Sequence, residues 1–123
     1  MRLLVSRLLL VPALLLGAPA ADAHAFLDHA VPGVGSDLQR APQVVTVWFT
    51  QELEPAFSTI TVVDQMGQRV DNDDAAVDSH DPTLLRVSLK PLPAGTYKVM
   101  WRVVSVDTHE TEGTFTFHCS GGA

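Results

Sequence analysis

Two stretches near opposite ends of the sequence contain the residues best suited to hold a metal ion. His24 directly follows the triplet Ala21-Asp22-Ala23, and the pair Asp107 and His109 lies near the other end. A cut after Ala23 would give His24 a free α-amine beside its imidazole. Two nitrogens of one residue can close a chelate ring on a metal, and an amine with a reference pKa of about 8 loses its proton with little penalty. His24 is therefore the first candidate ligand.

The second candidate segment is Val106 to Glu110. Asp107 and His109 are two residues apart, so in an extended segment their side chains project to the same side. Together with His24 they would supply two imidazoles, one amine and one carboxylate. Three nitrogens and one oxygen in a plane suit Cu(II), which also leads the affinity order of the divalent metals. The alternative is a turn in which Asp107 caps backbone amides and His109 is solvated.

The first 23 residues have the form of a secretory signal peptide. A short segment with two arginines precedes the apolar run Leu8 to Leu16, and Ala21 and Ala23 are the small residues that a signal peptidase reads. A competing cut after Ala20 also fits the small-residue rule. We expect cleavage after Ala23 and a periplasmic location, with residues 1–23 as the signal peptide.

Length and charge restrict what the remaining chain can do. The chain has 8 basic and 14 acidic residues, and removal of Arg2, Arg7 and Asp22 leaves a net charge of −7 with neutral histidines. An acidic protein of this kind is a poor partner for nucleic acid or for an anionic membrane surface. The roughly 100 residues from 24 to 123 suffice for one core and exclude large multi-element enzymes. We expect a single domain over residues 24–123, present as a monomer.

Alternation of apolar and polar residues predicts strands and no convincing helix. In the cleanest example, Leu85, Val87 and Leu89 alternate with polar residues. The predicted strands are Val44 to Thr50, Phe57 to Asp64, Leu84 to Lys90, Thr96 to Val104 and Thr114 to Cys119. Pro, Gly, Asn and Asp cluster between them. Short strands with such turns predict an all-β fold, either an antiparallel sandwich or a Greek-key barrel.

The longest irregular stretch, Asp71 to Pro82, holds five aspartates and His80. A calcium loop of the EF-hand type requires a glycine at its sixth position and a glutamate at its twelfth. This stretch has Ala76 and Pro82 at those positions. A solvated acidic loop is therefore the better interpretation.

Cys119 is the only cysteine, so no intramolecular disulfide can form. We interpret it as an incidental or partly buried thiol, with an intermolecular bridge or a soft-metal ligand as the alternatives. The neighbouring His118 faces the opposite side of the same strand, so the two residues cannot join one site. Asp28 and His29 fit an exposed strand face.

Three segments carry a resemblance to a known family. They are HAFLDHAVPGVGSDL from residue 24, FTQELEPAFS from residue 49 and GTYKVMWRVVSVDTHETEGTFTF from residue 95. Together they resemble the CopC/PcoC family of periplasmic copper-binding proteins over nearly all of residues 24–118. The resemblance implies an immunoglobulin-like or cupredoxin-like Greek-key β-sandwich or barrel of about seven strands. It also implies a role in copper homeostasis or copper resistance.

By the same resemblance, one Cu(II) ion per chain would be held in an N-terminal histidine brace. His24 would supply the amine and the imidazole, and Asp107 and His109 would complete the site. A CopD-type inner-membrane protein would take the copper onward.

Two features depart from the family pattern. Some members carry a methionine-rich loop that binds Cu(I), whereas the stretch from Asp64 to Pro82 has only Met66, and Met100 lies in a predicted strand. A thioether Cu(I) site is therefore not expected. Some members also carry an acidic residue near the terminal amine, and here Gln51 or Glu52 is the candidate for orienting that amine.

Three functions are consistent with these residues. The favoured one is a non-enzymatic copper carrier that holds Cu(II) and releases it to a partner. The second is an oxidative enzyme, because a histidine brace also serves copper monooxygenases. Two tryptophans and one tyrosine within strands, however, hardly form a flat substrate-binding face. The third is a metal-free β-sandwich that interacts through its strand edges.

Overall fold

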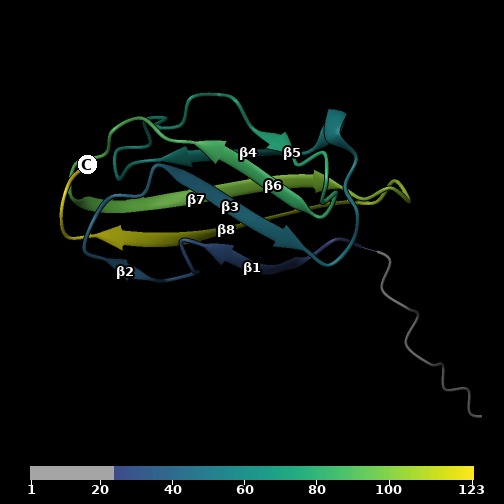
Figure 1. The fold of residues 1–123 in the computed structure, drawn as a ribbon, viewed down its shortest axis with the longest axis horizontal. Coiled ribbons are helices and arrows are strands. Elements are labelled where there is room, and N and C mark those ends of the chain that lie inside the picture. Colours follow the sequence, from purple (N-terminus) through teal and green to yellow (C-terminus); the bar gives the residue numbers. More distant parts are fainter. Residues whose placement is uncertain (1–23) are drawn as a thin grey trace, which may run out of the picture.

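The protein folds as a sandwich of two β-sheets (Figure 1). The computed structural model describes residues 24–123, so the predicted signal peptide lies outside the described residues. The strands are β1 (Leu27–Val31), β2 (Asp37–Leu38), β3 (Val44–Phe49), β4 (Thr59–Val63), β5 (Ala76–Val77), β6 (Leu84–Ser88), β7 (Gly95–Val104) and β8 (Glu110–Cys119), with one 3₁₀ turn, η1 (Pro55–Phe57). This part of the chain contains no helix long and apolar enough to cross a membrane.

Each sheet contains four strands. One has the order β1-β3-β6-β5 and the other the order β2-β8-β7-β4. The strand pairs are antiparallel apart from the parallel pair β2 and β8. The predicted all-β sandwich is therefore confirmed. Residues 24–123 form eight strands, against the about seven that the resemblance implied. Two of them, β2 and β5, have only two residues each, which is too short for an alternating pattern.

Strands β3 and β6 follow the predicted alternation. Val45 and Val47 of β3 pair with Val87 and Leu85 of β6, and all four side chains are fully buried between the sheets. Burial of an aliphatic side chain of this size contributes about 1.5–3 kcal/mol. These inner faces therefore hold the two sheets together.

Two strands begin two or more residues away from their predicted starts. β4 begins at Thr59 rather than Phe57, because Pro55 opens η1, which leaves Phe57 exposed. β8 begins at Glu110, four residues before the predicted start. Its first residues pair with the end of β7, but most of their side chains are polar, so the sequence shows no alternation of apolar and polar residues there.

An aromatic cluster fills the core between β3, β7 and β8. Phe49 and Trp101 meet edge to face, with ring centroids 5.1 Å apart. The indole of Trp101 also lies over Gly113, where an added Cβ would be 2.5 Å from Cζ2. A larger residue at position 113 would displace the indole, which explains the glycine in β8.

Hydrogen bonds to its own carboxylates hold the acidic stretch 71–82 in place. The buried Asp71 accepts hydrogen bonds from a backbone amide of β4 and from Arg69 Nε, the latter over 2.9 Å. Asp78 accepts from Arg86 Nη2 over 2.5 Å and from two backbone amides of the loop. These oxygens accept hydrogen bonds that attach the stretch to β4, to β6 and to itself, so the geometry gives the calcium alternative no support.

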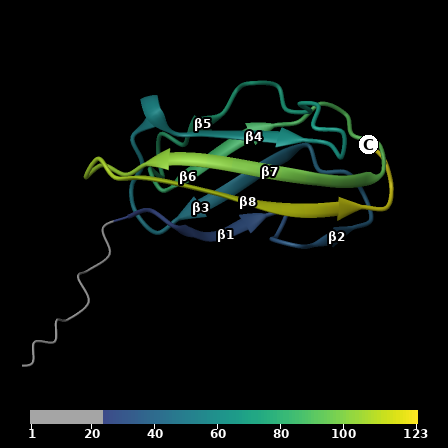
Figure 2. The ribbon, with the colours of Figure 1, turned by 180° about the vertical axis from the view of Figure 1, so that it is seen from behind.

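The two candidate ligand segments are brought to one end of the sandwich. The described segment before β1, η1 and the connection between β7 and β8 lie at this end, and the C-terminus lies at the opposite end (Figure 1). The view from behind shows the same arrangement (Figure 2). We call this the metal end, defined by residues 24–26, 50–57 and 105–113.

Candidate metal centre

His24 and His109 lie side by side at the metal end. Their ring centroids are 4.5 Å apart, with an angle of 47° between the ring planes. The His109 side chain is more than half exposed, and His24 is partly buried. Two of the three predicted ligands, from opposite ends of the described chain, thus meet at a surface that an ion can reach.

The connection between β7 and β8 is a tight turn. Ser105 N donates to His109 O over 3.0 Å, and Thr108 N donates to Ser105 O over 2.7 Å. Thr108 has a φ of 74°, in the left-handed region that residues other than glycine seldom adopt. The expectation that Asp107 and His109 share an extended segment is therefore wrong. The turn nevertheless places Asp107 Oδ1 3.4 Å from His109 Nδ1.

The turn also fixes the Asp107 carboxylate. The hydroxyl of the buried Ser105 donates to Asp107 Oδ1, and His109 N approaches the same oxygen at 3.4 Å. The Ser105 hydrogen bond is the main cause that holds the pKa of Asp107 below its ordinary value. Desolvation opposes this shift, and the contacts with His109 add to it. An ionised carboxylate serves metal ligation and amide capping alike, so the two interpretations are compatible.

Two threonines hold the segment that carries His24. Thr111 Oγ1 donates to the carbonyl of the fully buried Ala25 over 2.5 Å. Phe26 N donates to Thr50 Oγ1 over 3.0 Å, and Thr50 N donates back to Phe26 O over 2.9 Å. No sequence motif marks Thr50, Thr111 or Ser105, because their role follows from strand register and turn geometry.

The three predicted ligands form two contacting pairs that share His109. His24 contacts His109, and His109 contacts Asp107. Within residues 24–123, however, no three His, Cys, Asp or Glu side chains form a group that could hold a metal ion. In the full chain the His24 nitrogen belongs to the peptide bond with Ala23, and such an amide nitrogen cannot donate as an amine does. The donor types present fit Cu(II) once that bond is cut.

The segment after β3 supports the turn through its main chain. Val106 N donates to Glu52 O over 3.0 Å, and Glu54 N donates to Val104 O over 2.8 Å. The Glu52 side chain is exposed and that of Gln51 is half-buried. A role for either side chain in orienting the amine stays a prediction.

Two other histidines lie apart from the candidate site. His29 stacks on Trp48, with ring centroids 4.3 Å apart and ring planes 7° from parallel, and its Nδ1 is 2.7 Å from Asp28 Oδ2. The exposed strand face predicted for Asp28 and His29 is confirmed. His118 Nδ1 is 3.0 Å from Thr96 Oγ1 near the other end of β8.

Cys119 belongs to the core. Its side chain is fully buried, and Sγ is 3.8 Å from the carbonyl oxygens of Pro93 and Gly95. The interpretation as a buried thiol is confirmed, and the burial is complete rather than partial. A sulfur atom in this position is accessible neither to a second chain nor to a metal ion.

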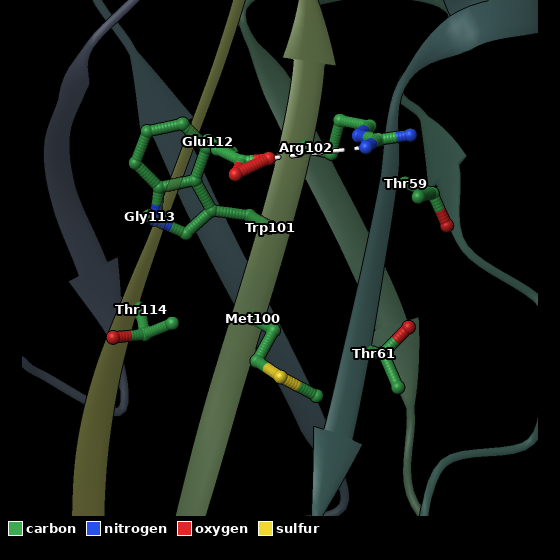
Figure 3. A pocket seen from close by; sticks show the side chains of 8 residues that line it. All are labelled: Thr59, Thr61, Met100, Trp101, Arg102, Glu112, Gly113 and Thr114. Carbon is green, nitrogen blue, oxygen red and sulfur yellow. Dashed lines mark ion pairs between the residues drawn. The ribbon is translucent and has the colours of Figure 1, made fainter.

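A pocket of about 490 Å³ lies on the outer face of β4, β7 and β8, and its lining residues include no histidine (Figure 3). Thr61, Met100 and Thr114 line it, and Arg102 Nη2 is 3.9 Å from Glu112 Oε2 at its edge. Met100 supplies the single sulfur among the lining residues. One thioether among threonines does not make the multi-methionine site that Cu(I) would require.

Comparison with known proteins points to one family. The sequence model of the CopC domain matches residues 27–120. Protein YobA of Escherichia coli K12 is 37% identical over 103 residues, which cover 80% of this chain and 81% of that protein. The copper transport protein CutJ of Bacillus subtilis is 34% identical over 96 residues, which cover 77% of this chain but only 18% of CutJ.

Solved structures agree with this match. The crystal structure of CopC from Methylosinus trichosporium OB3b superimposes with a TM-score of 0.74 at 32% identity, covering 79% of this chain and 94% of that one. PcoC from Escherichia coli, a methionine-rich copper resistance protein, superimposes with a TM-score of 0.71 at 33% identity, covering 79% and 99%. Both resemblances span the whole sandwich rather than one sheet.

Proposed function

The chain belongs to the CopC family of copper resistance and copper transport proteins, and from this premise we propose that its secreted form holds one Cu(II) ion with His24, Asp107 and His109. Proteins of this family bind copper and are not enzymes. The observation that carries the proposal is the 4.5 Å approach of the His24 and His109 rings beside a carboxylate with a lowered pKa.

Each ligand has a distinct part in the proposed site. The amine and imidazole of His24 form one chelate ring, so a single ordered residue supplies two donors. His109 supplies the third nitrogen, and Asp107 supplies the anionic oxygen that balances part of the charge of Cu(II). Such an N3O set favours a tetragonal Cu(II) complex over Cu(I). The exposed position of His109 lets the ion enter and leave without unfolding of the sandwich.

Cleavage after Ala23 is the step that would complete this site. It would turn the His24 peptide nitrogen into an amine, while Thr50 and Thr111 keep residues 25 and 26 in place. A signal peptidase acts during export, so the site would form only after the chain has left the cytoplasm. We therefore assign the active form to the periplasm, as a monomer.

The second part of the proposal is transfer of copper to a CopD-type inner-membrane protein. In CutJ the segment similar to this chain makes up 18% of a protein named for copper transport. That arrangement supports a pairing between a domain of this type and a further part that acts in copper transport. In the present chain the pairing would form between separate proteins.

Substitution of the ligands tests the copper site. We expect Asp107→Ala and His109→Ala each to weaken Cu(II) binding by at least about tenfold, because each removes one donor. Neither change should unfold the domain, since both side chains are exposed, although Asp107→Ala removes the acceptor of the Ser105 hydrogen bond and should lower the melting temperature of the apo-protein slightly. The measurement is a competition titration with a Cu(II) chelator on protein secreted and cleaved in vivo, alongside thermal melts. Affinities equal to that of the parent protein would refute the ligand set.

A further inference from the structure

Exposed apolar side chains gather around the metal end. Seven large hydrophobic side chains of residues 24–123 are exposed, and three of them, Phe26, Phe57 and Val106, lie at this end. They are 44%, 66% and 52% exposed, respectively. Single exposed apolar residues are common on protein surfaces, but several around one site indicate an interaction surface.

The segment 50–57 connects these three residues. Phe26 exchanges two hydrogen bonds with Thr50, Val106 N donates to Glu52 O, and Phe57 N donates to Glu54 O over 3.2 Å. The ring of Phe26 is also 6.1 Å from that of His24. The apolar residues are therefore part of the same framework that positions the candidate ligands, and a protein that covers them would also cover the ion.

Negative charge predominates around these residues. The segments 24–26, 50–57 and 105–113 contain five carboxylates and no lysine or arginine. The carboxylates belong to Glu52, Glu54, Asp107, Glu110 and Glu112. The nearest cation in sequence, Arg102 of β7, is engaged with Glu110 over 2.9 Å and lies 3.9 Å from Glu112. The metal end thus presents apolar side chains within an acidic rim.

We infer that the metal end is a docking surface for a copper-accepting protein whose own face carries an apolar depression rimmed by lysine and arginine. This inference rests on the proposed function, since docking at this end matters only if copper is bound and released there. A basic rim on the partner complements the carboxylates and speeds encounter. A second copy of this chain or an anionic lipid surface would instead be repelled by the same charges.

Photo-crosslinking tests the surface directly. The secreted full chain would carry p-benzoylphenylalanine in place of Phe57, an aromatic exchange outside the proposed ligands. The matched control carries it in place of Met66, which is 85% exposed beyond the far end of β4. Each copper-loaded protein is irradiated with washed inner membranes of the organism that produces the chain, and adducts are identified by mass spectrometry.

The expected result is one adduct from position 57, absent from position 66, with a membrane protein that itself takes up copper. Excess unmodified copper-loaded protein should abolish it, and raising NaCl from 0.05 to 0.5 M should reduce it at least about fivefold, because salt screens the charge attraction. The inference is overturned by no adduct, the same adduct from both positions, an adduct with lipid or a second copy, or insensitivity to salt.

A copper titration of the same variants separates this inference from the proposed function. If the parent chain and the position 57 variant bind Cu(II) equally but no adduct forms, the docking surface is wrong and the copper site stands. If the parent chain does not bind Cu(II) at all, the proposed function itself is wrong, and this conclusion does not depend on the crosslinking result.

Discussion

Ser105 links both ligands that the turn contributes to the proposed site. Its buried hydroxyl donates to Asp107 Oδ1 and lies 3.3 Å from His109 O. One side chain therefore orients the carboxylate, lowers its pKa and stabilises the turn that presents the imidazole. This is the kind of outer contact that tunes a metal site without touching the ion.

Removal of that hydroxyl should weaken copper binding. We expect Ser105→Ala to reduce the Cu(II) affinity about tenfold, because Asp107 loses the hydrogen bond that fixes it and favours its ionised form. The matched control is Ser58→Ala, which removes another buried hydroxyl, bonded to the main chain of Val104 rather than to a proposed ligand. Chelator competition measures both. Equal losses in the two variants would mean that Ser105 has no specific role.

The strands that hold the site could be predicted to different degrees. β3 and β7 were predicted because each buries every second residue, and that alternation is visible in the sequence. The start of β8 was missed because its inward positions are taken by Thr111 and by Gly113, which makes room for Trp101. The two-residue strands β2 and β5 are defined by pairing alone, and no local pattern encodes them.

The contact between Trp101 and Gly113 predicts a stability effect. Gly113→Ala should destabilise the apo-protein by about 1–3 kcal/mol, because the new methyl group would lie 2.5 Å from the indole Cζ2. The control is Gly33→Ala, whose Cβ would meet its nearest atoms at 3.9 Å, an ordinary contact. Urea unfolding measures both. A Gly113→Ala protein as stable as the parent would show that Trp101 can shift without cost.

The sequence suffices to propose the candidate ligands, but it does not predict their arrangement. The donor types of His24, Asp107 and His109 indicated Cu(II) from chemistry alone. The tight turn with Thr108 in the left-handed region and the supports from Thr50 and Thr111 depend on contacts between distant segments. Such contacts form only when the sheets assemble, so local sequence patterns do not predict them.

At the scale of the whole molecule, carboxylates make stability depend on pH. Asp74 and Asp78 have pKa values below the ordinary 3.8, mainly because of hydrogen bonds from Ser88 and Arg86, respectively. A carboxylate with a depressed folded pKa stabilises the native state fully above the unfolded value of 3.8. That contribution is lost as the pH falls through the lower folded pKa. Acid should therefore weaken the sandwich below about pH 4.

The pair Asp78 and Arg86 offers a test of this dependence. Asp78→Asn should lower the melting temperature at pH 7 by removing an ionised hydrogen-bond acceptor of Arg86 and two loop amides. The difference in melting temperature between the variant and the parent protein should become smaller as the pH falls below about 4, because the parent carboxyl group also becomes protonated. Asp37→Asn, at an exposed position in β2, is the control for loss of a charge. A difference in melting temperature that stays constant down to pH 2 would contradict this account.

The most direct test of the copper site is a Cu(II) titration followed by electron paramagnetic resonance on protein secreted and cleaved in vivo. A second protein with one additional alanine before His24 is measured in parallel. We predict that the native terminus binds one Cu(II) ion tightly with a nitrogen-rich tetragonal signal, and that the extended terminus loses this signal because its His24 nitrogen is again an amide. Equal binding by the two proteins, or binding by neither, would contradict the proposed role of the His24 amine.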